Sequence, residues 1–277
     1  GRDPVHARKT NDCRLMARLF KPMNPALTEW SGKVVWIVGA STGIGRAVAE
    51  QLAQRGARVM VSARQSEPLQ QFATQHPGAV AYPLDVTDLP ALQNAVQHIV
   101  QAQGRLDLVL FAAGIYKPLR AYRFDLARMK QHLDVNVVGA YNLVDATLPT
   151  LLQQGFGHLS FISSVAGWRG LPNSLAYGPT KAALTHFAEV LHYDLAGKGL
   201  GISAIHPGFV ETPLTAQNEF TMPALITTDV AATEILAGWA DGLFDIHFPK
   251  RFTWWLKLLR VLPHRWAQAL IKKLTRL

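Results

Sequence analysis

The sequence predicts an α/β protein in which one doubly wound parallel sheet of about seven strands carries helices on both faces. Short apolar runs alternate with stretches of helical periodicity, which is the pattern of βαβ units. The chain has 277 residues, of which 49% are hydrophobic and 17% charged, so it can bury one substantial core. This composition excludes collagen, a disulfide-based scaffold and a disordered chain.

Six apolar runs account for most of the expected sheet. They are short and carry few charges, as strands buried on both faces of a parallel sheet are. They lie at Val34–Val38, Arg58–Ser62, Val80–Leu84, Leu108–Ala112, Leu159–Ser163 and Ile202–Ile205. The longest helical patterns cover Phe124–Leu152 and Leu175–Leu195, and another helix is expected to begin near Ile44.

The charge is distributed unevenly and divides the chain into three regions. The formal net charge is +9, yet residues 34–246 carry 13 basic and 16 acidic residues, a net charge of −3. Residues 1–30 are expected to form an N-terminal arm, 31–248 the main domain and 249–277 a basic helical tail. Because the positive charge lies at the ends, the main domain is not expected to bind nucleic acid.

Cysteine use and hydropathy indicate the compartment. The single cysteine, Cys13, cannot form an internal disulfide or a cysteine-ligated metal site. No signal peptide is recognised, and no apolar stretch reaches the roughly 18 residues of a spanning helix. The expected location is the cytoplasm.

The turn after the first strand has the composition of a dinucleotide-binding loop. Glycines at 39, 43 and 45 allow a tight turn and a close approach to a phosphate. The following helix would present its unpaired N–H groups and positive dipole end to a pyrophosphate. The alternative is a glycine-rich turn that only packs the helix on the strand. The residues assigned to this loop are Gly39, Ser41, Thr42, Gly43, Ile44 and Gly45.

The end of the second strand indicates which dinucleotide binds. An acidic residue about 20 positions after the glycines would bond the ribose 2′-hydroxyl and repel a 2′-phosphate. The chain has Ala63 and Arg64 there, and a guanidinium suits a phosphate dianion. We therefore expect NADP(H) to be preferred, with NAD(H) as the other candidate. The alternative is that Arg64 is an ordinary surface arginine.

Tyr177, Lys181 and Ser164 are the candidate reactive residues. Four-residue spacing places Tyr177 and Lys181 on one helix face, and Ser164 follows the strand at Leu159–Ser163. A tyrosine must have its pKa lowered from about 10 to act near neutral pH, and a nearby ammonium shifts it in that direction. Pro179 predicts that this helix begins late or irregularly.

These motifs, taken in order, resemble the short-chain dehydrogenase/reductase family. The resemblance runs from about Lys33 to Phe248 and rests on the segments "VGASTGIG", "LDVTD", "FAAG", "LDVNVVGAYN", "YGPTK" and "PGFVETP". It implies a Rossmann-type domain. Hydride would pass between a nicotinamide and a carbonyl or alcohol carbon, with the ring chemistry belonging to the cofactor.

The resemblance also implies a role for each matching residue. Tyr177 would exchange the proton with the substrate oxygen, Lys181 would bind the nicotinamide ribose, Ser164 would orient the substrate, and Asn136 would hold a proton-relaying water. The further cofactor contacts implied are Asp85, Val86, Ala112, Ala113, Gly114, Pro207, Gly208, Val210 and Thr212. The chain departs from the family pattern at Val38, Phe111 and Ala112, where hydrogen-bonding side chains are replaced.

Several apolar and aromatic residues are candidates for a substrate pocket. They are Tyr116, Trp168, Leu171, Phe220 and Met222. They would suit a lipophilic ketone or secondary alcohol, and in the family the segment after Thr212 closes over substrate. The alternative is that they belong to the core. His206 is expected to be structural, and no histidine spacing predicts a metal site.

The tail pattern predicts two amphipathic helices separated by Pro263. One face would carry Trp254, Trp255, Leu258, Leu259 and Leu262, and the other Lys250, Thr253, Lys257, Arg260 and His264. A second stripe would carry Trp266, Ala269, Leu270, Leu274 and Leu277. Such helices suit an anionic membrane surface, such as the inner face of a membrane. The alternative is packing against the domain or against another subunit of a homo-oligomer.

The leading hypothesis is an NADP(H)-dependent oxidoreductase that acts on a small carbonyl or alcohol. A cofactor-binding sensor or scaffold that recruits partners through the tail is an alternative, as is an isomerase or epimerase. Turnover with net oxidation of NADPH separates the first from the other two.

Overall fold

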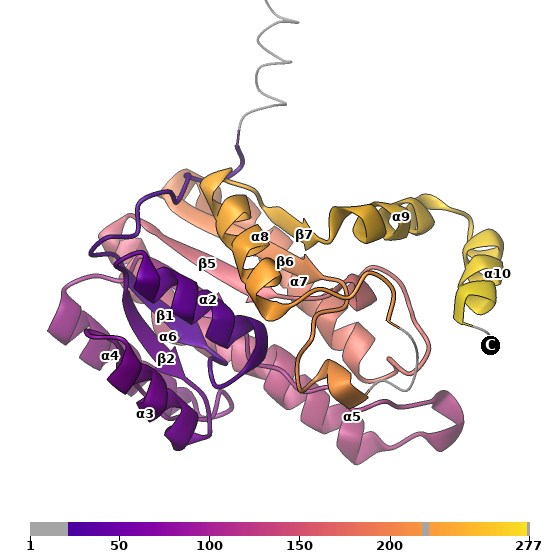
Figure 1. Cartoon of the computed structure of the whole chain (residues 1–277), viewed down its shortest axis with the longest axis horizontal. Coiled ribbons are helices and arrows are strands. Elements are labelled where there is room, and N and C mark those ends of the chain that lie inside the picture. The colour runs from indigo at the N-terminus through magenta and orange to yellow at the C-terminus, as the bar shows by residue number, and fades with distance from the viewer. Residues whose placement is uncertain (1–21, 218–221, 276–277) are drawn as a thin grey trace, which may run out of the picture.

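The computed structural model describes residues 22–217 and 222–275, and it shows a central sheet between two layers of helices (Figure 1). Seven parallel strands form the sheet in the order β3-β2-β1-β4-β5-β6-β7. The strands are β1 (Val34–Val38), β2 (Arg58–Ser62), β3 (Val80–Ala81), β4 (Leu108–Phe111), β5 (Gly157–Ile162), β6 (Leu200–Pro207) and β7 (Asp245–Phe248). The strand order reverses between β1 and β4, so the predicted doubly wound sheet is confirmed.

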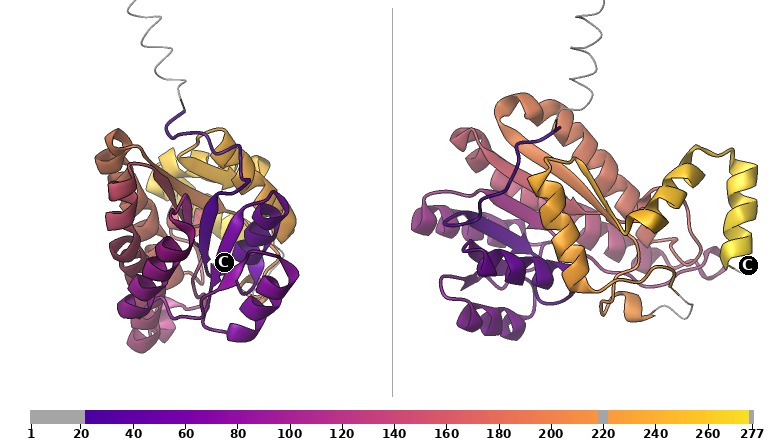
Figure 2. Two further views of the ribbon diagram at one scale, coloured as in Figure 1. Left: turned by 90° about the vertical axis from the view of Figure 1, so that its left-hand side faces the viewer. Right: turned by 45° about the horizontal axis from the view of Figure 1, so that its top comes forward.

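Three helices cover each face of the sheet (Figure 2). One layer contains α2 (Gly43–Gln54), α3 (Ser66–Gln75) and α8 (Thr228–Ala240). The other contains α4 (Leu89–Gln103), α6 (Gly139–Gln154) and α7 (Tyr177–Leu195). Short 3-10 turns connect the layers to the sheet: η1 (Ala121–Arg123), η3 (Val165–Gly167), η4 (Ala196–Lys198) and η5 (Thr215–Gln217).

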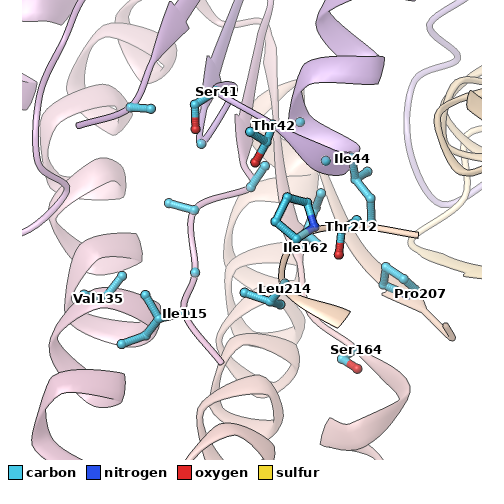
Figure 3. Close-up of a pocket in the computed structure, with 18 of the residues that line it drawn as sticks. Ser41, Thr42, Ile44, Ile115, Val135, Ile162, Ser164, Pro207, Thr212 and Leu214 are labelled. Carbon is cyan, nitrogen blue, oxygen red and sulfur yellow. The ribbon is translucent and has the colours of Figure 1, made fainter. Parts of the chain in front are cut away.

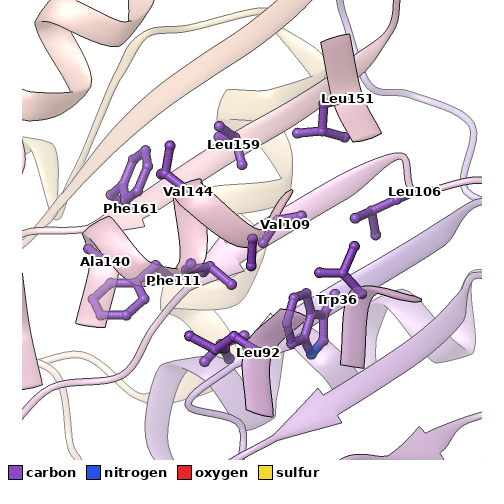
Figure 4. Packing of buried hydrophobic residues seen from close by; sticks show 14 of the residues in the cluster. Trp36, Leu92, Leu106, Val109, Phe111, Ala140, Val144, Leu151, Leu159 and Phe161 are labelled. Carbon is purple, nitrogen blue, oxygen red and sulfur yellow. The ribbon is translucent and has the colours of Figure 1, made fainter. Parts of the chain in front are cut away.

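Strand β1 is buried on both faces. Val34, Trp36 and Val38 point into the core beneath α4 and α6, whereas Val35 and Ile37 point toward α2 and α8. The Trp36 ring is fully buried with Leu92, Val109 and Phe111 around it (Figure 4). Packing on both sides fixes the ends of the strands, from which the loops carrying the candidate site extend.

The predicted helix over Phe124–Leu152 is one helical stretch with an irregular turn in its middle. It consists of α5 (Leu126–Leu133), the π turn η2 (Asp134–Val138) and α6. Helix α7 begins at Tyr177, so Pro179 lies in the first turn, where proline is tolerated. The predicted third strand is shorter than expected, since only Val80 and Ala81 pair with β2.

The described end of the expected N-terminal arm packs against the domain. Asn24 is buried, and its side chain donates to the carbonyl oxygen of Ile202 (2.8 Å) and accepts from the Ile202 N–H (3.0 Å). Trp30 packs against Trp239 with ring centroids 5.8 Å apart. Asn24 and Trp30 therefore attach this part of the chain to the domain.

The tail forms the two helices that the sequence predicts, α9 (Lys250–Val261) and α10 (His264–Thr275), which extend beyond the sheet (Figure 1). The predicted faces are partly wrong. Leu259 is buried with Thr253 against the domain, whereas Val261 is exposed beside the tryptophans. The domain covers one side of α9, and the sequence pattern does not tell which side. None of the helices described is long and apolar enough to cross a membrane.

Candidate active site

A cleft of about 580 Å³ opens at the carboxyl ends of the strands, where the sheet order reverses (Figure 3). Ligands bind at this position in open α/β sheets. All the residues that the sequence assigned to a cofactor line the cleft. They are Gly39, Ser41, Thr42, Gly43, Ile44, Gly45, Arg64, Asp85, Val86, Ala112, Ala113, Gly114, Tyr177, Lys181, Pro207, Gly208, Val210 and Thr212.

The turn after β1 fits the phosphates of a dinucleotide. Gly39 has φ +101°, and a Cβ there would collide with the backbone of Ala113. A Cβ on Gly45 would collide with the carbonyl oxygen of Gly39. Thr42 precedes α2 without a side-chain capping hydrogen bond, and no acidic residue lies in the first turn. The positive end of the helix dipole therefore faces the cleft without a competing carboxylate.

Arg64 and Asp85 lie at the edge of the cleft that begins at β2. The Arg64 side chain is exposed, and its charge acts on the Asp85 carboxylate. Burial raises the pKa of Asp85, but hydrogen bonds from Thr87 and the positive charge of Arg64 outweigh it, so the net pKa is lowered. Asp85 accepts from the Thr87 backbone N–H at 2.9 Å and from its hydroxyl at 2.8 Å. The carboxylate is thus held in place, while the guanidinium reaches solvent.

Tyr177 and Lys181 lie one turn apart on α7 and line the same cleft. The Lys181 Nζ atom is buried, lies 5.3 Å from the centroid of the Tyr177 ring, and donates to the carbonyl oxygen of Ile162 at 2.8 Å. The predicted pair is therefore brought together beside the glycine-rich turn. The carbonyl of Ile162, the last residue of β5, fixes the lysine side chain.

Burial controls the pKa values of this pair. Desolvation raises the pKa of Tyr177 well above its usual value, although a hydrogen bond with Ser164 opposes the increase. Desolvation also lowers the pKa of Lys181 to about 7. The sequence argument, in which an ammonium lowers the pKa of the phenol, predicts the opposite direction for Tyr177. In the protein itself, the loss of water around the two side chains changes their pKa values more than their effect on each other does.

Ser164 connects the end of β5 to Tyr177. Its hydroxyl accepts a 3.1 Å hydrogen bond from the Ala166 N–H, which caps η3, and also bonds to the Tyr177 side chain. A Cβ on Gly167 would collide with the backbone of Lys181, so η3 packs tightly against α7. This contact sets the distance between the serine loop and the tyrosine helix.

Asn136 lies on the π turn and is buried behind the cleft. Its Oδ1 accepts from the Ile115 N–H at 2.8 Å, and its Nδ2 donates to the Ile115 carbonyl and the Thr180 hydroxyl, both at 3.0 Å. A Cβ on Gly114 would lie 3.4 Å from both Asn136 Oδ1 and Lys181 Nζ. Asn136 thus joins the loop after β4 to α7, and it approaches the cleft behind Gly114.

The five predicted substrate residues have different surroundings, and one of them, Leu171, is half-buried and does not line the cleft. The Tyr116 ring meets the Tyr177 ring edge-on at 5.1 Å, so it lies next to the candidate site. Met222 is half-buried and does not line the cleft, and Phe220 lies outside the described residues. Trp168 lines a different hollow, between α6 and α7, and packs against His206 at 5.0 Å. Among the predicted substrate residues that the structure describes, Tyr116 is the one whose ring contacts the reactive tyrosine.

The cleft also contains residues that the sequence argument did not select. Most of them directly follow a strand or are adjacent in sequence to a predicted motif. This position in the sequence could have been used to predict them. They are Gln65, Leu84, Ile115, Val135, Ile162, Ser163, Pro213, Leu214 and Thr215. Thr215 donates to the Val210 carbonyl at 2.5 Å, which folds the segment after β6 back over the cleft.

His206 belongs to a buried polar network, as the structural interpretation expects. Its Nδ1 is 2.8 Å from an Asp245 carboxylate oxygen and its Nε2 is 2.9 Å from the Thr185 hydroxyl. Asp245 also accepts from Lys257 of α9 at 2.7 Å. Thr185 and Ser163 both donate to the carbonyl oxygen of Lys181. Across residues 22–217 and 222–275, no cluster of three or more His, Cys, Asp or Glu side chains is placed to hold a metal ion.

Comparison with known proteins identifies relatives of this chain. A family model described as short chain dehydrogenase matches residues 33–222. An uncharacterized oxidoreductase of Myxococcus xanthus (strain DK1622) is 36% identical over 252 residues, which is 90% of this chain and all of that protein. Another, from Staphylococcus aureus (strain USA300), is 33% identical over 192 residues, covering 69% of this chain and 83% of its own.

Solved structures share the fold. A short chain dehydrogenase/reductase from Burkholderia phymatum, in complex with NAD, has a TM-score of 0.77 at 23% identity, covering 84% of this chain and 94% of its own. A short chain dehydrogenase/reductase family protein has a TM-score of 0.70 at 25% identity, covering 79% of this chain and 97% of its own. The fold of this chain therefore agrees with an established architecture.

Proposed function

The chain belongs to the short chain dehydrogenase family of oxidoreductases, and from that premise we propose that it uses NADP(H) to interconvert a carbonyl group and a secondary alcohol on a lipophilic small molecule. The main support for the proposal is that Ser164, Tyr177 and Lys181 line the same cleft as the glycine-rich turn. Bound NADPH would supply the hydride for the carbonyl carbon.

In the reduction of a carbonyl, the substrate oxygen needs a proton, and Tyr177 holds one at neutral pH. The Tyr177 hydroxyl would give this proton to the carbonyl oxygen as the carbon receives the hydride. Ser164 holds that oxygen by a hydrogen bond. Lys181, with a pKa of about 7, binds the ribose and supplies positive charge to the tyrosine when it is protonated. Asn136 bonds the loop after β4 to Thr180 of α7, and it would hold a water there.

The preference for NADP(H) rests on Arg64. Its exposed side chain follows β2 at the edge of the cleft, where the ribose 2′-position of a dinucleotide would lie. A guanidinium binds a phosphate dianion with charge-assisted hydrogen bonds. The charge of Arg64 also acts on the carboxylate of Asp85, which accepts hydrogen bonds from Thr87.

An apolar substrate fits the reactive end of the cleft. Ile115, Val135, Ile162 and Leu214 line the cleft, and the Tyr116 ring lies against Tyr177. These side chains offer few hydrogen bonds to a substrate beyond Ser164 and Tyr177, so a ketone or aldehyde with apolar substituents should bind best.

Oxidation of NADPH by purified protein tests this function. A panel of ketones and aldehydes graded by lipophilicity should show turnover that rises with apolar size. Tyr193→Phe removes a hydroxyl from an exposed tyrosine of the same helix and serves as the matched control for Tyr177→Phe. Binding of NADPH without turnover on the whole panel would favour a cofactor-binding sensor, and conversion of substrate without net oxidation would favour an isomerase.

Self-association is proposed through α6 and α7. The rings of Tyr141 and Phe187 meet at 4.7 Å between these helices. Apolar side chains on the two helices reach solvent, namely Tyr141, Leu152, Val190 and Tyr193, and so does Val138, which directly precedes α6. A second copy would cover them.

The single cysteine, Cys13, favours a reducing compartment, and the cytoplasm is the proposed location.

A further inference from the structure

Helix α9 has two apolar faces, of which the domain covers one. The covered face carries Phe252, Leu256 and Leu259, which are buried or half-buried. The other face carries Trp254, Trp255, Leu258 and Val261, of which Trp255 is 69% exposed and Val261 77% exposed. The exposed apolar side chains therefore remain after α9 has packed on its own domain.

Polar contacts fix α9 in this orientation. Lys257 donates to Asp245 at 2.7 Å and lies over the ring of Trp168 at 5.5 Å. Arg169 donates to the carbonyl oxygens of Arg260 and Leu262 at 3.3 Å. Because both sets of contacts hold the covered face to the domain, α9 cannot rotate to bury its tryptophans without breaking them.

The tail continues the exposed surface into α10 and adds positive charge to it. Trp266 is 69% exposed, and α10 stands away from the sheet in both views that show it (Figures 1 and 2). Residues 247–277 contain eight lysine and arginine residues and no aspartate or glutamate. Arg251, Arg260 and Arg265 are exposed near these aromatic side chains. Tryptophan and arginine together are typical of helices that lie in a lipid headgroup region.

We propose that the exposed face of α9 and α10 is a docking surface for an anionic phospholipid bilayer, on which both helices lie flat. Each helix has 12 residues and is about 18 Å long, which is too short to span the hydrocarbon core. A second copy of the tail is a poorer partner, because it brings eight more positive charges and no acidic residue. A bilayer supplies anionic headgroups for the arginines and an apolar interior for the tryptophans.

Docking would bring the cleft close to the membrane. Phe252 lies on the covered side of α9, and its ring centroid is 5.7 Å from that of Phe209. A Cβ on the cleft residue Gly208 would lie only 3.0 Å from the Phe252 ring. One helix diameter, about 10 Å, thus separates this wall of the cleft from the lipid surface. This arrangement would suit a substrate dissolved in the bilayer, an inference that rests on the proposed function.

Vesicle flotation of the full chain tests the docking surface. Wild type should float with phosphatidylcholine–phosphatidylserine vesicles and much less with phosphatidylcholine alone, and high salt should reduce the bound fraction. The double variant Trp255→Ser, Trp266→Ser should lower the partition coefficient at least tenfold. The double variant Tyr122→Ser, Phe124→Ser removes two exposed aromatic side chains outside the tail and should leave the partition coefficient unchanged.

Charge reversal separates a lipid surface from a protein partner. Arg251→Glu with Arg265→Glu should abolish binding to the anionic vesicles while the melting temperature stays within a few degrees of wild type. Equal flotation of all variants, or of wild type with neutral vesicles, would overturn the proposal. So would a fall in the solution mass of Trp255→Ser, Trp266→Ser, which would assign the face to a second copy. Turnover of a water-soluble ketone is independent of this outcome and reports on the proposed function alone.

Discussion

The Lys181 Nζ atom lies 5.3 Å from the centroid of the Tyr177 ring and is bonded to the Ile162 carbonyl oxygen. Both side chains are withdrawn from water, so the folded protein favours their neutral forms: it raises the pKa of Tyr177 and lowers that of Lys181 to about 7. Tyr177 therefore holds the proton that a substrate oxygen would receive, and a protonated Lys181 would stabilise the phenolate that remains.

The stability of the free protein should depend on pH through Lys181. Its pKa is about 7 in the folded state and near 10.5 when unfolded, so between these values the unfolded chain binds the extra proton. Stability contributed by this group therefore rises with pH from about 7 to 10, by at most about 1.4 kcal/mol per pH unit.

The comparison of Lys181→Met with wild type isolates this effect. The variant should gain stability relative to wild type at pH 7, and the gain should shrink as pH rises to 9, as measured by urea denaturation. Lys198→Met, at an exposed lysine after the same helix, should show no such trend. A difference between Lys181→Met and wild type that does not vary with pH would contradict the lowered pKa.

Arg64→Ala should reverse the cofactor preference. Loss of a charge-assisted contact to the 2′-phosphate should raise the KM for NADPH at least tenfold and leave the KM for NADH nearly unchanged. Arg55→Ala, which removes an exposed arginine at the end of α2, is the matched control. Wild-type protein that prefers NADH would contradict the assignment.

Asp245→Asn should weaken the attachment of α9. Burial raises the pKa of Asp245, but its bonds with His206 and Lys257 outweigh burial and lower it well below its ordinary value. Since this carboxylate is about one-third exposed, its loss should destabilise the protein by about 1–2 kcal/mol at pH 7.

That contribution should disappear in acid. The folded pKa is lowered, so the stabilisation is complete above the unfolded pKa near 4 and is lost as the pH falls below it. Thermal unfolding of Asp245→Asn and wild type should therefore converge at acidic pH. Equal melting temperatures at pH 7 would show that Lys257 and His206 do not depend on Asp245.

The sheet and the cleft could be predicted from the sequence because both follow local patterns. Apolar runs mark β1 and β2 to the residue, and the glycine spacing locates the turn at Gly39–Gly45. Because these strands are buried on both faces, few arrangements of the strands in the sheet are possible.

Properties set by tertiary packing could not be predicted. The direction of the Tyr177 pKa depends on how much water each side chain loses, which spacing along a helix does not reveal. Trp168 follows a strand as pocket residues do, yet it packs beside His206. Leu259 has the same periodicity as the exposed tryptophans, and only the position of the domain shows that it is covered.

The central claim is that the Tyr177 hydroxyl delivers the proton to a substrate held beside a bound nicotinamide cofactor. The most direct measurement pairs NADPH binding, followed by its fluorescence, with NADPH oxidation by Tyr177→Phe on the best ketone of the panel. We predict a cofactor Kd within about twofold of wild type and a kcat lower by 10²–10⁴-fold, the range for loss of a general acid. A kcat close to that of wild type with intact binding would contradict the account.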